Sequence, residues 1–341
     1  MALMSVAASA SAGTGKTARK VYRTRNGTTF RDTGKPPIKE RRDRQGRLTE
    51  SVHHVVGEDG KPAIAKTFHQ VFGTPAWRPG ERASGVSNQL RNLEARGVKR
   101  IPKSLGVAGD GYGTSVITSA AKGRNLALIG ARKRRPSLRS IARTIAAAAD
   151  VVGSQQRRSP YSKRPGGFIH QDLKPEHIFV EDINAARPKV TVIDWENMSE
   201  AGSQSYPKMI TPAFAAPEMW TSKPRTYAMD VYALGASMRY MVTGQAFDGR
   251  AFDAAYAVDR KNQKAATQFM LDGGSVEEAA TRFPTNNLET AIRGELARPY
   301  DAPPGLKAII DKAMSYDPAQ RYQTNRAFAR ALRDWAATRK R

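Results

Sequence analysis

A pair of short apolar runs in the middle of this 341-residue chain constrains its fold more than any other feature. The runs Ile178–Val180 and Val190–Ile193 are typical of buried strands. Asp172 precedes the first run with Lys174 two residues further on, and Asp194 directly follows the second run. The pattern fits a β-hairpin with acidic ends. It also fits a phosphoryl-transfer site, because one acid can orient a hydroxyl nucleophile while another holds magnesium.

The composition allows one large or two modest hydrophobic cores. Hydrophobic residues make up 40% of the chain, so a two-lobed fold suits its length. Cysteine is absent, which excludes disulfides and thiolate metal sites. The most apolar helix-like stretch, Ile141–Val152, is too short to span a bilayer. We therefore expect no membrane span, no signal peptide and a cytoplasmic location.

Basic residues dominate the charge. Fifty-six Lys and Arg against thirty-one Asp and Glu give a net charge of +25, with twelve of the basic residues in positions 1–47. We expect that segment to be a disordered tail that contacts a polyanion, either nucleic acid or an acidic protein. A solvated arginine-rich surface would explain the same charge. The run Ala10–Thr17 formally fits a phosphate-binding loop, but the strand and helix that should flank it are missing.

The stretch Phe168–Glu196 resembles the catalytic loop H-R-D-L-K-x-x-N and the D-F-G turn of the eukaryotic-like (Hanks-type) Ser/Thr protein kinases. The resemblance implies that Asp172 accepts or orients the substrate hydroxyl proton and that Lys174 neutralises charge on the phosphoryl group. It implies that Asp194 binds Mg²⁺, with His177 at the position of the family's second metal-binding residue, an asparagine. Imidazole suits magnesium poorly, so Mn²⁺ is an alternative ion.

Three later segments extend the resemblance. Residues 209–218 are similar to the T-P-x-Y-x-A-P-E motif, which implies that Thr211 contacts the catalytic aspartate and selects Ser/Thr substrates. The D-V-Y-A-L-G run implies that Asp230 hydrogen-bonds the catalytic-loop backbone. The late D-P-A-Q-R run implies a buried pair between Arg321 and Glu218.

The nucleotide-binding residues also follow from the resemblance. Lys66 ends an A-I-A-K run, and in the family this lysine pairs with the α and β phosphates of ATP. Residues 86–96 predict an amphipathic helix, on which Glu94 is the chosen partner of that lysine. The backbone of the connection from Ser119 to Ala121 would bind the adenine edge.

These motifs together predict an α+β, bilobal, protein-kinase-like fold with a small β-rich N-lobe and a larger helical C-lobe. After the tail, we place the N-lobe at 48–118 and the C-lobe at 119–341, with a family-variable insertion at 245–300. No G-x-G-x-x-G is present, so a degenerate phosphate-covering loop is expected within 45–56.

The predicted function is ATP-dependent transfer of the γ-phosphoryl group to Ser/Thr hydroxyls of a protein substrate. Two alternatives stay open. A pseudokinase that binds nucleotide or acts as a scaffold is compatible with His177 in place of the family's asparagine, with the absence of a glycine-rich loop, and with the lack of a clear glutamate partner for Lys66. The D-W-E sequence formed with Trp195 and Glu196 resembles small-molecule phosphotransferases of the aminoglycoside and choline type.

Overall fold

The computed structural model describes residues 19–338 except 44, 71–78, 110–112, 133, 157–165, 205–209 and 222. The run Ala10–Thr17 lies outside these residues. The chain divides into two compact units. The first contains the chain up to Ser84 together with Leu105–Thr118, and the second contains Gly85–Ser104 and the chain from Ser119 onward. Helix α1 (Pro79–Ala95) belongs partly to each.

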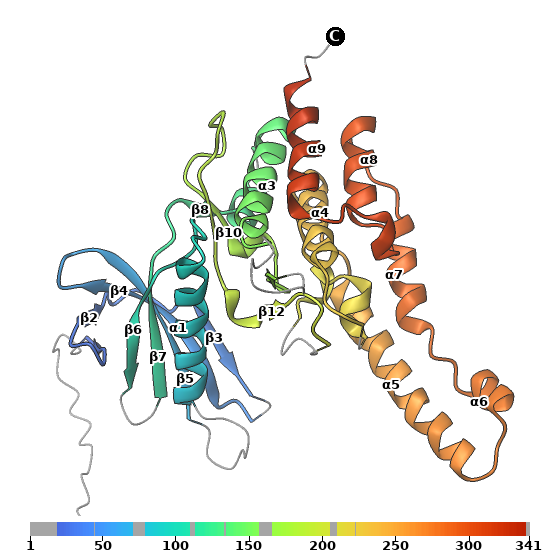
Figure 1. Cartoon of the computed structure of the whole chain (residues 1–341). Helices are drawn as coiled ribbons and strands as arrows, with labels where there is room; N and C mark the ends of the chain where they lie inside the picture. The colour runs from blue at the N-terminus through green and yellow to red at the C-terminus, as the bar shows by residue number, and fades with distance from the viewer. Residues whose placement is uncertain are drawn as a thin grey trace, which may run out of the picture. The chain divides into compact units, whose positions relative to one another are not determined.

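The first unit is built on a seven-stranded sheet (Figure 1). Its order is β1-β2-β4-β5-β7-β6, and β3 also pairs with β4. The strands are β1 (Val21–Arg23), β2 (Thr29–Asp32), β3 (Lys39–Arg42), β4 (Leu48–Gly57), β5 (Pro62–His69), β6 (Ser104–Gly109) and β7 (Gly113–Ser119). Strands β4 and β5 form a hairpin, with Gly60 at positive φ in its turn. In β5, Ala63 and Ala65 alternate with less buried residues and face the core.

The prediction of a disordered tail through residue 47 is wrong for the described residues from Val21 to Arg42, which form three strands. Tyr22 in β1 and Phe30 in β2 anchor these two strands, since both aromatic rings are buried in the core of the first unit. Two isolated aromatic residues among basic ones do not form an alternating apolar pattern strong enough to predict strands from the sequence. The prediction of a phosphate-covering loop within 45–56 is wrong over residues 48–56, because β4 occupies them.

The second unit is mostly helical. Its helices are α2 (Leu126–Gly130), α3 (Leu138–Gly153), α4 (Tyr227–Thr243), α5 (Gly249–Leu271), α6 (Val276–Arg282), α7 (Asn287–Ala297), α8 (Pro304–Ala313) and α9 (Asn325–Ala337). Short 3₁₀ turns cover Pro175–His177, Trp195–Asn197, Pro212–Phe214, Pro217–Trp220 and Pro318–Gln320. Helix α4 is buried almost all round, and α3 packs against both α4 and α9 (Figure 1).

Two small sheets complete the second unit and carry the site. Strands β8 (Arg124–Asn125), β10 (Ile178–Val180) and β11 (Val190–Val192) form one, in the order β11-β10-β8. Strands β9 (Phe168–Ile169) and β12 (Ser199–Glu200) form the other. The two apolar runs of the sequence analysis are therefore an antiparallel pair, as the hairpin pattern predicted.

The segment 245–300 contains α5, α6 and α7. Helix α7 is the last of the three. Its N-terminus is held by a residue distant in sequence: the carboxylate of Asp259 on α5 accepts hydrogen bonds from the backbone N–H groups of Asn287 and Leu288. A cap supplied by another helix leaves no local sequence signal.

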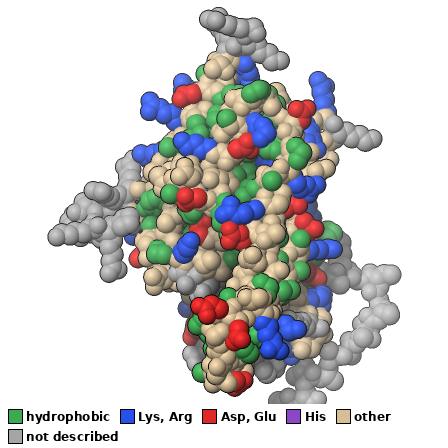
Figure 2. All heavy atoms as spheres, turned by 90° about the vertical axis from the view of Figure 1, so that its right-hand side faces the viewer, with side chains coloured by type: hydrophobic (Ala, Val, Ile, Leu, Met, Phe, Trp, Pro, Cys, Tyr) green, Lys and Arg blue, Asp and Glu red, His purple; other side chains and the backbone are tan. Residues whose placement is uncertain are grey.

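The surface of the molecule carries both signs of charge. Figure 2 shows a face on which basic side chains are interspersed with acidic ones. Among the residues that the structure describes, no helix is long and apolar enough to cross a membrane.

Candidate active site

The loop between β9 and β10 is held in place by Asp230, in the first turn of α4. Its carboxylate, only 1% exposed, accepts the backbone N–H groups of His170 at 2.9 Å and Gln171 at 3.1 Å. Burial raises the pKa of Asp230 to about 7, whereas the two backbone donors act in the opposite direction. The hydrogen bonds expected for this aspartate are thus confirmed.

His170 lies beneath the loop as a neutral, fully paired side chain. Its Nε2–H donates to the carbonyl of Ile193 at 2.9 Å, and its Nδ1 accepts the backbone N–H of Asp172 at 3.3 Å. Burial lowers the pKa of His170. The ring of Trp195 packs on it with centroids 4.6 Å apart. This contact gives the tryptophan of the D-W-E sequence a structural role, in packing under the loop.

Asp172, Lys174 and Thr211 form one hydrogen-bonded network. The Thr211 hydroxyl donates to Asp172 Oδ1 at 2.6 Å and accepts from Lys174 Nζ at 2.7 Å. Lys174 Nζ also lies 3.2 Å from Asp172 Oδ2. The side chains of Asp172 and Lys174 are 9% and 15% exposed, so the charges interact in a largely dry environment where they are stronger than in water. The contact expected between Thr211 and Asp172 is present.

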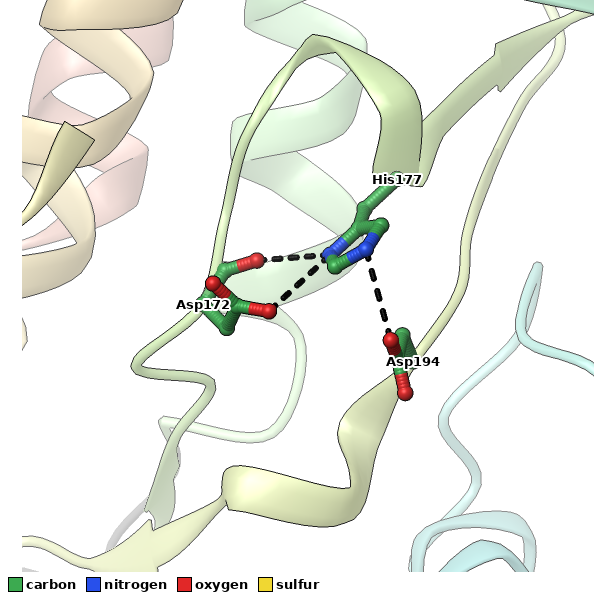
Figure 3. A group of neighbouring side chains, drawn as sticks. All are labelled: Asp172, His177 and Asp194. Carbon is green, nitrogen blue, oxygen red and sulfur yellow. Dashed lines mark hydrogen bonds and ion pairs between the residues drawn. The ribbon is translucent and has the colours of Figure 1, made fainter. Parts of the chain in front are cut away.

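A second cluster joins the loop to the end of β11 (Figure 3). Asp172, His177 and Asp194 each offer one ligand atom, and these atoms lie within 4.8 Å of one another. His177 Nδ1 is 2.7 Å from the backbone carbonyl of Asp172, and Nε2 is 3.3 Å from Asp194 Oδ2. Two carboxylates and an imidazole at this spacing fit a divalent cation.

Backbone strain is concentrated beside this cluster. Asp194 has φ 63° and ψ 54°, and Gln171 has φ 65°, both in the left-handed region. Aspartate tolerates this conformation better than glutamine does. For Gln171, the hydrogen bond from its backbone N–H to Asp230 and one from its Nε2 to the carbonyl of Asn197 hold the strained backbone.

Burial also keeps His177 uncharged. Desolvation lowers the pKa of His177 to about 4, against the opposing attraction of Asp194. The imidazole is therefore neutral at pH 7, and in this state it can coordinate a metal ion.

Lys66 lies in the first unit and forms an ion pair with a carboxylate that was not predicted from the sequence. Its Nζ is 3.6 Å from Oε1 of Glu50, on the neighbouring strand β4. Arg82 on α1 lies 3.2 Å from Oε2 of the same carboxylate, and Arg41 on β3 lies 3.9 Å from it. The side chain of Glu50 is only 2% exposed. An inward-facing acid within a strand is the sequence signal that could have found it.

Two other predicted nucleotide-binding residues, Glu94 and Ser119, have local partners. Glu94 Oε1 lies 3.4 Å from Lys103 Nζ, and the glutamate side chain is 49% exposed. Because Glu94 and Lys66 belong to different units, their pairing stays a prediction. The backbone N–H of Ser119 donates to the carbonyl of Lys103 at 2.9 Å, so this donor already has an acceptor. A contact of adenine with the backbone at Ala121 stays a prediction.

Glu218 and Arg321 form the expected buried pair. Two parallel hydrogen bonds of 2.8 Å join the guanidinium to the carboxylate, and the two side chains are 0% and 5% exposed for arginine and glutamate, respectively. The pair connects segments 103 residues apart.

Comparison with known proteins agrees with this geometry. A family model described as protein kinase domain matches residues 161–332. The serine/threonine-protein kinase PknK of Mycobacterium bovis is 28% identical over 170 residues, which are 49% of this chain and 13% of PknK. The kinase PkaA of Streptomyces coelicolor is 24% identical over 189 residues, covering 54% of this chain and 29% of PkaA. PknJ of Mycobacterium tuberculosis is 25% identical over 207 residues, which are 57% of this chain and 29% of PknJ.

The β-rich and helical units, with the aspartate loop in the second, define an α+β protein-kinase fold, which confirms the predicted fold class. The family model matches about half of the chain. The chain therefore belongs to the protein kinase family, as a divergent member of the Hanks-type Ser/Thr group. It spans less than a third of the length of these three relatives.

Proposed function

We propose that this chain transfers the γ-phosphoryl group of ATP to Ser or Thr hydroxyls of a protein substrate. The observation that carries the proposal is the network of Asp172, Thr211 and Lys174. A carboxylate fixed from two sides can orient an incoming hydroxyl and take up its proton. An ammonium group beside it can offset negative charge on the transferring group.

The divalent ion, when bound with nucleotide, neutralises phosphate charge. Asp194 and His177 would hold this ion, while Asp230 keeps the catalytic-loop backbone in place. In the first unit, Lys66 would bind the α and β phosphates, with Glu50 on the neighbouring strand helping to position its ammonium group. The role of Ala121 would be limited to its backbone, at the adenine edge.

Protein substrates are favoured over small molecules by the segment around Thr211. The hydroxyl of Thr211 lies between Lys174 and Asp172, and the pair of Glu218 and Arg321 fastens the end of the same segment. A segment so fixed can present an extended peptide to the catalytic carboxylate.

The experiment compares acceptors. Purified protein is incubated with γ-labelled ATP and either Mg²⁺ or Mn²⁺, in the presence of a basic protein mixture, an aminoglycoside or choline. We expect acid-stable label on Ser or Thr of the protein acceptor. Label on the aminoglycoside or choline instead would support a small-molecule phosphotransferase, and nucleotide binding without transfer to any acceptor would support a pseudokinase.

Replacement of Thr211 tests the network itself. Thr211→Ser keeps the hydroxyl, so we expect this variant to retain most of the transfer rate. Thr211→Val removes the hydroxyl, and we expect its transfer rate to be lower about tenfold or more. Equal rates for the two variants would remove this network as the basis of the proposal.

A further inference from the structure

The second unit contains a cavity of about 660 Å³, lined by residues other than those of the catalytic network. Helices α4, α7 and α8 (Figure 1) contribute to its wall, together with Phe247 and the segments 298–300 and 314–317. The volume lies within the range of about 300–1,000 Å³ that is typical of small-molecule sites. The cavity is therefore large enough for a ligand of its own.

Arg239 on α4 places a positive charge at the wall of this cavity. The residue is only 8% exposed, and its guanidinium lies over the rings of Phe247 and Tyr300, 4.5 and 4.8 Å from their centroids. Its two terminal nitrogens donate to the backbone carbonyls of Arg298 at 3.1 Å and Glu295 at 3.4 Å. The rings and the carbonyls thus hold the guanidinium in one orientation.

Most of the hydrogen-bonding capacity of Arg239 is unused in the described part of the chain. A guanidinium has five N–H groups, the two carbonyl contacts use one on each terminal nitrogen, and the buried Nε has no acceptor there. Arg321 in the same unit differs, because its five N–H groups all have acceptors and two of them meet the carboxylate of Glu218. A buried cation without a hydrogen-bonded counter-ion is costly unless a ligand supplies one.

Three further cations line the more open part of the cavity. Arg293 and Arg298 are exposed, and Lys307 is partly exposed. Each pairs with an acid three or four residues away. Surface pairs of this kind contribute little to stability, so these side chains can turn towards an incoming anion.

Two acids, Asp311 and Asp317, line the same cavity. Asp311 accepts hydrogen bonds from Lys307 Nζ at 2.6 Å and from the Tyr300 hydroxyl at 2.8 Å. Asp317 accepts the backbone N–H of Ala319 at 2.9 Å. Both carboxylates have protein donors, and the wall carries four cations against these two acids, so its charge stays positive.

We propose that this cavity binds a small organic anion, with its carboxylate or phosphate on Arg239 and its apolar body against Leu296 and Tyr316. Each terminal nitrogen of the guanidinium keeps one N–H group, which suits an oxyanion that accepts two hydrogen bonds. The proposal concerns a second site and does not depend on the proposed function.

The first test uses the full chain and three probes, and it needs no phosphoryl transfer. The anions 4-phenylbutyrate and phenyl phosphate carry a carboxylate and a phosphate on an aromatic body, and 4-phenylbutanol is the neutral counterpart. Affinities are measured by ligand-observed NMR titration. We expect at least one anion to bind about tenfold or more tighter than the alcohol, because a charged acceptor strengthens hydrogen bonds from the guanidinium. The two anions distinguish the head groups.

Variants locate the binding. Arg239→Met removes the guanidinium, so we expect the affinity for the anion to fall about tenfold or more. The matched control is Arg330→Met, the same change at an exposed position of α9, which should leave the affinity unaltered. Ala297→Phe keeps Arg239 but adds a ring at an exposed position of the cavity wall, and it should weaken the anion similarly. This second variant keeps the proposal testable if Arg239→Met fails to fold.

The outcomes separate this site from the catalytic one. Equal affinities for the anions and the alcohol, no binding of any probe, or undiminished anion binding in Arg239→Met or Ala297→Phe would overturn the proposal. Label transfer from ATP bears only on the proposed function, so either proposal can fail while the other stands.

Discussion

Replacement of Arg321 by methionine offers a stringent test of how the second unit is held together. The guanidinium has no exposed surface and all of its N–H groups have acceptors. Two of the N–H groups donate to the carboxylate of Glu218. The other three donate to the carbonyls of Ser315 at 2.7 Å, Tyr316 at 3.0 Å and Ala228 at 3.1 Å. Methionine matches much of the volume but none of the hydrogen bonds. The variant therefore leaves a buried carboxylate and three carbonyls without these donors.

Loss of one partner from a buried ion pair costs about 3–5 kcal/mol, because the remaining charge is uncompensated. That is a large part of the total stability of a typical domain, about 5–15 kcal/mol. We expect urea unfolding of Arg321→Met to show a lower midpoint with an unchanged slope. The double variant Arg321→Met/Glu218→Leu should be more stable than Arg321→Met alone, since it removes the stranded charge.

The control is Arg298→Met, which breaks the pair with Glu295 three residues away on an exposed surface, where the arginine is 58% exposed. It should cost less than about 1 kcal/mol. The reasoning is refuted if Arg321→Met costs no more than this control, or if the double variant is less stable than Arg321→Met.

Three further predictions follow from other parts of the molecule. Glu50→Gln should lower the free energy of unfolding of the first unit by about 1–3 kcal/mol, measured by denaturant titration, because it removes a buried charge that lies among three cations. The contribution of His170 and His177 to stability should fall as pH decreases from about 6.5 towards 4, since both stay neutral when folded but become protonated when unfolded, whereas Asp230, whose pKa burial raises to about 7, contributes in the opposite direction over this range; urea midpoints of the wild type and His177→Asn across this range isolate the histidine contribution. Gly123→Ala should prevent stable folding, as judged by circular dichroism, because the added Cβ would overlap the carbonyl of Val180 at a positive φ of 89°.

Each of these has a matched control. Glu58→Gln, an exposed acid that follows the same strand, should change stability by no more than about 0.5 kcal/mol. The stability of the wild type relative to His177→Asn should decrease as pH falls from about 6.5 towards 4, and a difference independent of pH would contradict the assigned cause. Gly202→Ala shares a positive φ of 85° but meets nothing within 4 Å, so it should cost only about 1–2 kcal/mol. Equal behaviour of the two alanine variants would contradict the steric argument.

The sequence predicted the second unit well because its determinants lie in short motifs. The hairpin of β10 and β11, the contact of Thr211 with Asp172, and the pair of Glu218 and Arg321 could each be expected from residue types at fixed spacings. Each motif has side chains that require a partner when buried, and the fold supplies those partners.

The sequence was less informative where partners come from distant segments. The carboxylate beside Lys66 belongs to Glu50, whose other cations come from β3 and α1. Helix α7 begins where Asp259 of α5 caps it. Strands β1 and β2 are ordered by tertiary burial of two aromatic rings, whereas local propensity predicted disorder there.

Asp172→Asn tests the central claim most directly, because the change keeps the shape of the side chain and removes the charge that would orient the substrate hydroxyl. The measurement is the initial rate of label transfer from γ-labelled ATP to Ser or Thr of a protein acceptor, with Mn²⁺ and with Mg²⁺, for the wild type and the variant. We predict measurable transfer by the wild type and a rate reduced at least about a hundredfold in the variant, with nucleotide affinity changed much less. Equal rates for the two proteins, or no transfer by the wild type with either ion, would contradict the assignment of this site as a protein kinase active site.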